Sequence, residues 1–502
     1  MQVTLADMLD SPVIRSEILE QQGDLALSVT GITDDSRRVT PGTVFVAVRG
    51  ERADGHRFLP QALQSGAAAL IVQQPQPPET VPVIRVKDSR RALGLLGSRF
   101  YGAPASRLRM VGVTGTNGKT TITYLTRAVL ESAGRKVGLI GTVAYQIGEE
   151  VVSASHTTPG ALELQALLSR MVSAGMDAAV MEVSSHALAL DRTVGCEYDV
   201  AVFTNLTQDH LDFHRDMEAY FSAKLRLFTG LADGKLKPSK RAIVNADDPW
   251  SERIRQATAV PLWTYAIKER ADLRAEGLRL SASGTTFAVT TPYGRAKVES
   301  RLVGEHNVYN ALAAIGVGLQ EGLALDRVCE GIASVHNVPG RFERVEAGQP
   351  FTVVVDYAHT EDALVRLLSA ARALRPGRII TVFGCGGDRD RIKRPKMGRA
   401  AVEYSDVVVL TSDNPRTEDP QAILRDVEVG VKEALRRRPQ VRYHLISDRR
   451  EAITCAVQEA RSGELILIAG KGHEDYQIVG TTKHHFDDRE VAREAILNAR
   501  AL

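Results

Sequence analysis

Short apolar runs recur along the whole chain and alternate with polar, turn-rich or helical segments. In the N-terminal part, such runs lie at 44–48 (VFVAV), 67–73 (AAALIVQ) and 81–86 (VPVIRV), with turn residues between them. Apolar runs of this length, bounded by turn residues, are typical of buried strands. They predict a small α/β domain at the N-terminus.

A second region follows a regular order of strand, turn and helix. A strand at 109–113 precedes a glycine-rich turn and a helix from Lys119 to about Ala133. Further strands are expected at 137–140, 177–182, 198–203 and 241–245. At 307–322 one helix face carries apolar residues at helical spacing, namely Val308, Ala311, Leu312, Ile315 and Leu319. Because strands alternate with helices, this region predicts a doubly wound parallel sheet covered on both faces.

A third region begins after the turn-rich segment 336–341, which has the composition of a linker. Its expected strands, separated by helical patterns, lie at 351–355, 378–382, 406–410, 441–445 and 464–468. They predict a second, Rossmann-like sheet. Dividing the length by about 150 residues per domain also suggests roughly three domains. We therefore predict an α/β protein with a small N-terminal α/β domain (1–103), a central doubly wound domain (104–337) and a Rossmann-like C-terminal domain (338–502).

Composition narrows the class of protein. The 502 residues include 63 Lys and Arg against 61 Asp and Glu, a formal net charge of +2, and 44% of them are hydrophobic. This is the composition of an ordinary globular protein, and it excludes disorder, collagen and coiled coil. A dedicated nucleic-acid binder would show a strong basic excess. The balance favours an enzyme that acts on small molecules.

The sequence also bears on location. No stretch of 18 uncharged apolar residues exists, so no membrane span is expected. The first residues carry Asp7 and Asp10 where a secretory signal would be basic and then apolar. The four cysteines lie far apart without a C-x-x-C pair, so neither disulfides nor a zinc cluster are expected. We expect a cytoplasmic protein with no nucleic-acid or membrane partner, and a monomer.

The strongest local motif lies between a predicted strand and a predicted helix. It runs Gly115, Thr116, Asn117, Gly118, Lys119, Thr120, Thr121. Glycines in such a turn let backbone N–H groups close around phosphate oxygens, the lysine adds a positive charge, and the Thr120 hydroxyl can ligate Mg²⁺. The strict Walker pattern would have glycine where Val113 stands. The loop predicts an ATP site, with Mg²⁺ as cofactor.

Two polar segments follow further strands of the central region. The segment 182–192 (EVSSHALALDR) begins with Glu182, a candidate magnesium ligand, and also holds Ser184 and Arg192, which can hold an acidic acceptor. The segment 203–214 (FTNLTQDHLDFH) contains His210 among several acidic and histidine side chains. Such a set can bind a transition metal. The oxygen-rich surroundings and the ATP loop favour magnesium.

In the C-terminal region four polar clusters each follow a predicted strand, at 356–360, 383–391, 411–416 and 469–475. Ligands of open parallel sheets bind at the carboxyl ends of the strands, so these clusters predict one site. Arg389 and Arg416 can bind carboxylates, and Asp413 and Glu474 can accept from an amine. The arrangement suits an amino acid.

The phosphate motif, TGTNGKTT, resembles that of the Mur ligases, the ATP-dependent enzymes that build the peptidoglycan stem peptide. The resemblance covers nearly the whole chain, from Asp35 to Glu474. It looks closest to the members that add meso-diaminopimelate to UDP-N-acetylmuramoyl-L-alanyl-D-glutamate. The resemblance implies an ADP-forming ligase that makes its amide bond through an acyl phosphate during peptidoglycan precursor synthesis.

The resemblance also implies roles for individual residues. Lys224, which by pattern alone is a half-buried helix lysine, matches a carbamylated lysine that helps to position magnesium, and His210 matches a residue at a second magnesium. Catalytic roles are thus implied for Lys119, Glu182, His210 and Lys224, and metal ligation for Thr120, Glu182, His210 and carbamylated Lys224.

Substrate contacts follow in the same way. Asn307, Arg341, Asp356 and His359 match residues near ATP. The acceptor's uridine diphosphate and muramoyl peptide would contact Ser36, Glu51, Arg52, Ala53, Thr157, Thr158, Ser184 and Arg192. Diaminopimelate would contact Arg389, Asp413, Asn414, Pro415, Arg416, Gly470 and Glu474.

Three alternatives stay open at this stage. The chain can be an L-lysine-adding homologue, although such enzymes lack the arginine of the DNPR segment. It can be a folylpolyglutamate synthase-like ligase, which shares the loop and the chemistry but lacks the N-terminal domain. It can also be a P-loop sensor without catalysis.

Overall fold

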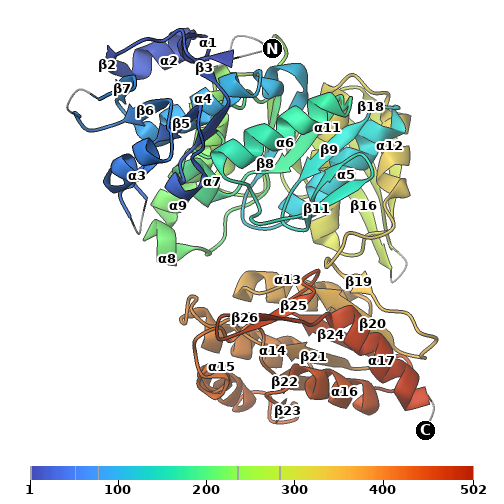
Figure 1. Ribbon diagram of the computed structural model, residues 1–502. Coiled ribbons are helices and arrows are strands. Elements are labelled where there is room, and N and C mark those ends of the chain that lie inside the picture. Colours follow the sequence, from blue (N-terminus) through green and yellow to red (C-terminus); the bar gives the residue numbers. More distant parts are fainter. Residues whose placement is uncertain (1–2, 51–52, 77–78, 234–236, 282–283, 501–502) are drawn as a thin grey trace.

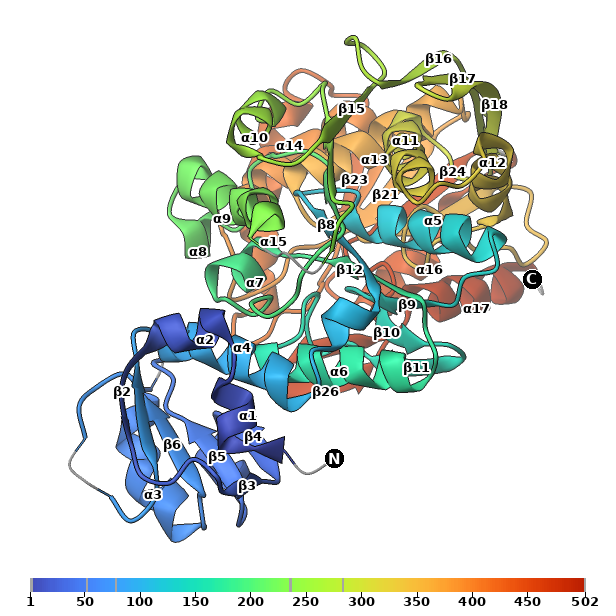
Figure 2. The same ribbon diagram turned by 90° about the horizontal axis from the view of Figure 1, so that it is seen from above.

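The computed structural model describes residues 3–50, 53–76, 79–233, 237–281 and 284–500. Three larger sheets, each with its own helices, follow one another along the chain. In Figure 1 the C-terminal sheet lies below the other two, and Figure 2, seen from above, shows the N-terminal part standing to one side of the central part. Within the described residues, no helix combines the length and the apolar character that crossing a bilayer requires.

The N-terminal sheet has the strand order β2-β7-β6-β5-β4. The strands β4 (Gly31–Thr33), β5 (Thr43–Val46), β6 (Ala69–Val72) and β7 (Val83–Val86) are parallel, and β2 (Ile18–Gln22) joins β7 in antiparallel fashion. Around the sheet lie α1 (Leu5–Leu9), α2 (Pro12–Glu17), α3 (Leu59–Gln64), α4 (Ser89–Phe100) and the small pair β1 (Val3–Thr4) and β3 (Ser28–Val29). The three predicted strands of this region are confirmed as β5, β6 and β7.

The central sheet has eleven strands in the order β11-β10-β9-β12-β8-β13-β14-β15-β16-β17-β18. Its middle is parallel and consists of β9 (Val137–Ile140), β12 (Ala178–Glu182), β8 (Arg109–Thr114), β13 (Val200–Phe203), β14 (Arg241–Asn245), β15 (Leu262–Ala266) and β16 (Leu273–Ser281). This confirms the predicted parallel sheet. Antiparallel strands extend it at both edges: β10 (Ala144–Ile147), β11 (Glu150–Ser153), β17 (Gly284–Thr291) and β18 (Gly294–Ser300).

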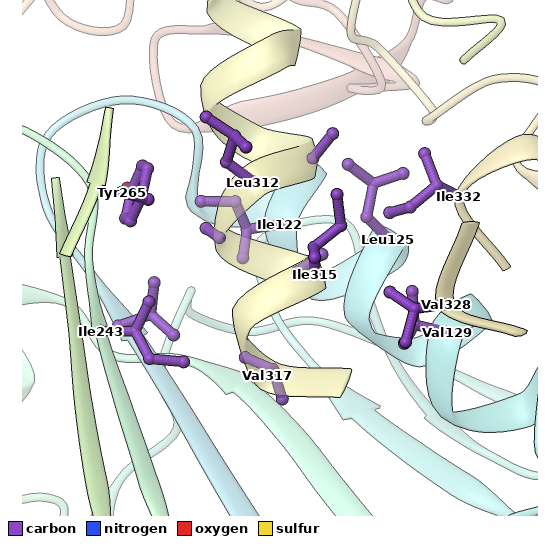
Figure 3. Packing of buried hydrophobic residues seen from close by; sticks show 14 of the residues in the cluster. Ile122, Leu125, Val129, Ile243, Tyr265, Leu312, Ile315, Val317, Val328 and Ile332 are labelled. Atoms are coloured by element: carbon purple, nitrogen blue, oxygen red, sulfur yellow. The ribbon is translucent and has the colours of Figure 1, made fainter. Parts of the chain in front are cut away.

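Helices cover both faces of the central sheet. One face carries α5 (Lys119–Ser132), α11 (Glu305–Gln320) and α12 (Leu325–Ser334), and the other carries α6 (Ala161–Ser173) and α9 (Met217–Thr229). Figure 3 shows Ile122, Leu125 and Val129 of α5 interleaved with Leu312 and Ile315 of α11 and with Val328 and Ile332 of α12. The helix predicted at 307–322 is confirmed, and its predicted apolar face is fully buried. Each such aliphatic side chain contributes about 1.5–3 kcal/mol by leaving water.

Three shorter helices of this region lie beside its polar segments: α7 (Ser185–Ala189), α8 (Leu211–His214) and α10 (Ser251–Ala257). Ser184 caps α7, since its hydroxyl accepts from the N–H of Ala187. The two segments that the sequence marks for metal and acceptor binding therefore begin where β12 and β13 end.

The C-terminal sheet has the order β19-β20-β24-β21-β22-β23. Its parallel strands β20 (Thr352–Asp356), β21 (Ile379–Phe383), β22 (Val407–Leu410), β23 (Arg442–Leu445) and β24 (Leu465–Ala469) confirm the five predicted ones, and β19 (Glu343–Arg344) is antiparallel. One face packs against α13 (Glu361–Ala373), α14 (Lys393–Tyr404) and α15 (Pro420–Leu435), the other against α16 (Arg449–Glu459) and α17 (Asp488–Arg500). A hairpin of β25 (Tyr476–Val479) and β26 (Thr482–His485) follows the last strand.

Candidate functional site

Two adjoining cavities lie where the carboxyl ends of the central strands face the C-terminal sheet. The smaller has a volume of about 410 Å³ and is lined by the phosphate loop, and the larger, of about 940 Å³, is lined by the strand-end clusters of the C-terminal sheet. They share the wall residues Thr142, Thr157, Ser184, Asp209, His210, Tyr357, His359 and Thr360. Loops from both sheets thus line two cavities that lie directly side by side.

The phosphate loop joins β8 to α5 as the sequence predicts. Gly115 and Gly118 have φ of 141° and 92°, in the region that favours glycine. A Cβ on Gly115 would lie 1.9 Å from Thr204 Oγ1, and one on Gly118 would lie 2.5 Å from Asn310 Oδ1. Glycine is therefore required at both positions, and the remaining loop residues 116–121 line the smaller cavity.

Lys119 is folded back on its own loop. Its Nζ donates to the carbonyls of Gly115, at 3.0 Å, and Thr116, at 2.8 Å. Burial lowers the pKa of this ammonium, and the Glu182 carboxylate works in the opposite direction. A negatively charged ligand in the loop would favour the charged form in the same way as Glu182 does.

Glu182, at the end of β12, is fixed by hydroxyl and amide donors. Its Oε1 accepts from Thr120 Oγ1 at 2.9 Å and from the Thr142 N–H at 2.8 Å, and its Oε2 accepts from the Thr142 hydroxyl at 3.0 Å. Arg341, from the other side of the space, donates to Thr120 Oγ1 at 3.0 Å. The two candidate magnesium ligands Thr120 and Glu182 are therefore close enough for both to reach one metal ion.

His210 begins α8 with a φ of 53° and lies next to Asp209, whose Oδ2 is 3.3 Å from His210 Nε2. Burial lowers the pKa of His210 to about 3, with a partial opposing effect of Asp209. The imidazole is therefore neutral at physiological pH, which suits a metal ligand. Within the described ranges, no three His, Cys, Asp or Glu side chains gather closely enough to hold a metal ion by themselves.

Lys224 projects from α9 beneath the phosphate loop. It is buried, and its Nζ donates to the carbonyl of Gly115 at 2.8 Å and lies 4.5 Å from the centre of the Tyr220 ring. Burial holds its pKa well below the usual value, and Lys119 lowers it further. A neutral amine in this position is the form that reacts with carbon dioxide.

The residues matched to ATP from outside the loop all line the smaller cavity: Asn307, Arg341, Asp356 and His359. Arg341 lies over the Tyr357 ring at 4.7 Å. Asp356 accepts from the N–H groups of Phe342, at 2.7 Å, and Ala358, at 2.8 Å, and so holds together the loops on either side of β20. Burial raises the pKa of Asp356 and lowers that of His359.

The acceptor residues fall into two groups. Thr157, Thr158, Ser184 and Arg192 line the larger cavity, where Thr158 Oγ1 bonds to the Glu182 carbonyl and accepts from the Ser184 N–H. Ser36 donates to Gln61 Oε1 at 2.8 Å within the N-terminal sheet and, like the exposed Ala53, lines neither cavity. Glu51 and Arg52 lie outside the described residues.

The predicted amino-acid cluster is assembled at the far side of the larger cavity. Arg389, Asp413, Asn414, Arg416, Gly470 and Glu474 all line it, whereas Pro415 does not. Asn414 Nδ2 donates to Glu474 Oε2 at 3.0 Å, and Arg416 Nη1 donates to the Gly387 carbonyl at 2.8 Å. The three clusters after β21, β22 and β24 therefore meet, as the parallel sheet predicts.

Several residues of this region were not predicted from the sequence. Thr142, after β9, provides two of the donors to Glu182. Lys471 is buried among Asp413, Asn414 and Glu474. Arg449 of α16 donates to the carbonyls of Ser412 and Ala469, which belong to two of the strand-end clusters. The only sequence feature that pointed to Lys471 was its position inside the strand-end segment 469–475. The burial of Lys471 and its pairing with Asp413 and Glu474 depend on tertiary packing, which the sequence pattern does not show.

Comparison with known proteins gives matches along almost the whole chain. Three family models match: the Mur ligase family catalytic domain at residues 28–101, the Mur ligase middle domain at 113–318 and the Mur ligase glutamate ligase domain at 340–472. A relative from Geobacillus thermodenitrificans, UDP-N-acetylmuramoyl-L-alanyl-D-glutamate–2,6-diaminopimelate ligase, is 49% identical over 474 residues, which cover 94% of this chain and 96% of the relative.

Two further matches agree. A relative of the same name from Solibacter usitatus is 50% identical over 470 residues, which cover 93% of each chain. A solved structure with that enzyme name is 34% identical and aligns over 100% of both chains with a TM-score of 0.71.

Proposed function

The chain belongs to the Mur ligase family, and we propose that it adds meso-2,6-diaminopimelate to UDP-N-acetylmuramoyl-L-alanyl-D-glutamate in an ATP-dependent, ADP-forming reaction. The observation that carries this proposal is that the two cavities adjoin and share eight wall residues. The phosphate loop lies on one side of their shared wall and the Arg389, Asp413, Arg416 and Glu474 cluster on the other. A phosphoryl group and an incoming amine can therefore reach the same carboxylate.

The chemistry proceeds in two steps. The D-glutamate γ-carboxylate attacks the γ-phosphorus of ATP, which gives an acyl phosphate and ADP. The amine of diaminopimelate then attacks the acyl carbon, loses a proton, and displaces inorganic phosphate as the amide forms. The residues contribute mainly by positioning the reactants and by compensating charge.

ATP binds in the smaller cavity. The backbone N–H groups of Gly115 to Thr121 surround the phosphates at the N-terminus of α5, and Lys119 turns from the loop carbonyls toward them. Asn307 of α11 contributes to the base end. Arg341 and His359 approach from the C-terminal sheet, and Asp356 fixes the loops that carry them.

Magnesium is the cofactor that the oxygen donors fit, because the Thr120 hydroxyl and the Glu182 carboxylate are in contact beside the phosphate loop, and His210 lines the same cavity. Thr120, Glu182, His210 and carbamylated Lys224 would hold it. When bound, the metal supplies positive charge between two anions that otherwise repel each other. Carbamylation converts the buried Lys224 amine into an anion and so provides a further oxygen ligand.

The acceptor extends from the N-terminal sheet to the shared wall. Its uridine diphosphate contacts Ser36, Glu51, Arg52 and Ala53, and its muramoyl peptide contacts Thr157, Thr158, Ser184 and Arg192. The incoming amino acid places its carboxylates at Arg389 and Arg416 and an ammonium group at Asp413 and Glu474. Asn414, Pro415 and Gly470 complete this subsite. We also propose that the enzyme acts as a monomer in the cytoplasm, where ATP is supplied, with domains at 1–103, 104–337 and 338–502.

The test is release of inorganic phosphate from ATP in the presence of UDP-N-acetylmuramoyl-L-alanyl-D-glutamate. We expect release to require both this acceptor and meso-diaminopimelate, and L-lysine to replace the latter poorly. Equal rates of phosphate release with the two amino acids would refute the proposed specificity for meso-diaminopimelate, but not the proposed ligase activity. ATP turnover that does not depend on the two co-substrates would refute the ligase and favour a sensor. Failure to bind a UDP-sugar would instead favour a folylpolyglutamate synthase-like ligase.

A further inference from the structure

A fully buried lysine lies at the centre of the amino-acid cluster. Lys471 follows β24, and its Nζ lies 3.6 Å from Asp413 Oδ1, 3.4 Å from Glu474 Oε2 and 3.2 Å from Asn414 Oδ1. Its side chain has no exposed surface, whereas Asp413 and Glu474 line the larger cavity. The ammonium group is therefore behind the two carboxylates and does not itself reach the ligand.

The two carboxylates need this cation. Asp413 Oδ1 is buried and has no hydrogen-bond partner among the described residues, so its ion pair with Lys471 compensates its charge. Burial raises the pKa of Glu474, Asp413 raises it further, and Lys471 acts in the opposite direction. Two buried carboxylates without a cation between them tend to share a proton.

We propose that Lys471 is a positioning residue whose ammonium group pairs with both Asp413 and Glu474, so that the two carboxylates stay apart and both accept from an ammonium group of the incoming amino acid. The inference rests on the proposed function of this subsite. Without the lysine, the two neighbouring carboxyl groups would share a proton, and this proton would occupy oxygens that otherwise accept from the substrate ammonium. Raising the pH would remove the shared proton and restore these acceptors.

Other charged or titratable groups surround the pair. Arg449 of α16 faces it from below, but its own charge is compensated by Asp488 at 2.7 Å. Glu474 also faces titratable or charged groups from the loop after β20, from β25 and from its own loop, namely Tyr357, Tyr476, Asp475 and His473. Burial raises the pKa of both tyrosines above 10 and lowers that of His473 to about 3, so none of the three titrates near neutral pH.

The experiment compares the full-length enzyme with its Lys471→Met and Lys471→Gln variants in the phosphate-release assay from pH 6.5 to 9. In Lys471→Met one carboxyl group retains a proton that the substrate ammonium must displace. We expect KM for meso-diaminopimelate to rise roughly ten- to hundred-fold at pH 7, and to fall again as the pH rises. KM for ATP and the wild-type pH dependence of kcat should not change.

Lys471→Gln separates charge from hydrogen bonding, because glutamine can still donate to Asn414 Oδ1 but carries no charge. We expect it to behave like Lys471→Met. The matched control is Lys432→Met, which removes an exposed lysine of α15 from a surface pair with Glu428 and should leave KM unchanged. Thermal melting of each variant shows whether the chain is folded. If Lys471→Met does not fold, Lys471→Gln is used for the comparison of KM.

The outcomes are distinct. If wild-type enzyme shows no diaminopimelate-dependent phosphate release, the proposed function fails. If wild type is active but both variants keep the wild-type KM across the pH range, the inference about Lys471 alone fails. A rise in KM that is equal at every pH, or a glutamine variant with wild-type KM, would also overturn it, since either result makes Lys471 a packing or hydrogen-bonding residue.

Discussion

The central and C-terminal sheets each bury a lysine beside a strand-end loop, and the two lysines have different partners. Lys224 of the central region has a backbone carbonyl and the Tyr220 ring as its nearest polar and aromatic partners, and burial dominates its pKa. Lys471 of the C-terminal region lies between Asp413 and Glu474. The first environment favours a neutral amine, and the second compensates a charge.

The difference shows that burial alone does not determine the chemistry of a lysine. An amine without a nearby carboxylate loses its proton easily and can then react as a nucleophile, as carbamylation requires. An ammonium between carboxylates remains a structural cation. The same side chain thus suits covalent modification in one region and charge balance in the other.

Replacing Lys224 provides the largest effect. We expect Lys224→Ala to lower kcat by about a thousand-fold, because an oxygen ligand for magnesium is lost from the phosphate-transfer site. The measurement is the phosphate-release assay described above. Full activity of this variant would rule out the role of Lys224.

Carbon dioxide sharpens the same prediction. Wild-type enzyme held in carbon dioxide-depleted buffer should lose activity and regain it when bicarbonate is added. Intact-mass analysis under non-denaturing conditions should show one added carbon dioxide in the wild-type enzyme and in Lys471→Met, and none in Lys224→Ala. Modification of Lys471 instead would reverse the comparison between the two lysines.

Arg449 tests a second compensated cation of the C-terminal region. Its side chain is fully buried and pairs with the equally buried Asp488. We expect Arg449→Met to destabilise the protein by about 3–5 kcal/mol, because the Asp488 charge is left buried without a partner. Arg450→Met is the matched control on the same helix, since Arg450 and its partner Glu494 are both more than half exposed. It should cost about 1 kcal/mol or less in chemical denaturation. Similar losses for both variants would contradict the argument.

The dependence of stability on pH tests the charge compensation between Glu418 and Arg394. It pairs with the fully buried Arg394, and hydrogen bonds from this guanidinium lower the pKa of Glu418 to about 2 from 4.5. The stabilisation from this lowered pKa is therefore present above pH 4.5 and is lost as the pH falls toward 2. Glu418→Gln should cost about 1–3 kcal/mol at pH 7 and should weaken the loss of stability between pH 4.5 and 2. If Glu418→Gln lost stability between pH 4.5 and 2 as steeply as the wild type does, Glu418 would not contribute to the acid-induced loss of stability.

A smaller effect is expected where the two regions touch. Asp362 of α13 accepts from Asn117 of the phosphate loop at 2.7 Å and from Thr207 at 3.2 Å. Asp362→Ala should lower kcat/KM for ATP by about ten-fold, the equivalent of roughly one hydrogen bond to a charged group. The Asp362→Asn variant keeps an oxygen acceptor, so its kcat/KM for ATP should lie between the values of the wild type and of Asp362→Ala. An exposed carboxylate of α15, Glu433, provides the control as Glu433→Ala.

Much of this arrangement could be predicted from local pattern. Most parallel strands of the three larger sheets and the phosphate loop were predicted, because each depends on an apolar run or on glycines at fixed spacing, whereas the parallel strands β4, β15 and β16 were not predicted. The hairpin β25–β26 and the antiparallel edge strands β10, β11, β17 and β18 were not. None of them shows a long continuous apolar run, and β11, β18 and the hairpin include exposed residues, so their pairing depends on their tertiary surroundings.

The site shows the same division. Arg389, Asp413, Arg416 and Glu474 could be predicted from strand-end clusters, since parallel topology brings such clusters to one edge. Lys471 and Arg449 could not, because charged residues are usually exposed and only tertiary packing shows that these two are buried. Their function depends on partners that are distant in sequence.

The hairpin β25–β26 has a consequence for protein engineering. Gln477 donates to the Asp413 carbonyl, Ile478 donates to Asn414 Oδ1, and the Arg416 N–H donates to Ile478. The loop after β22 is therefore braced by a segment more than sixty residues further along the chain. A chimaera that acquires a new amino-acid preference by exchanging 411–416 alone would lose this brace, so a successful transplant has to carry both segments together.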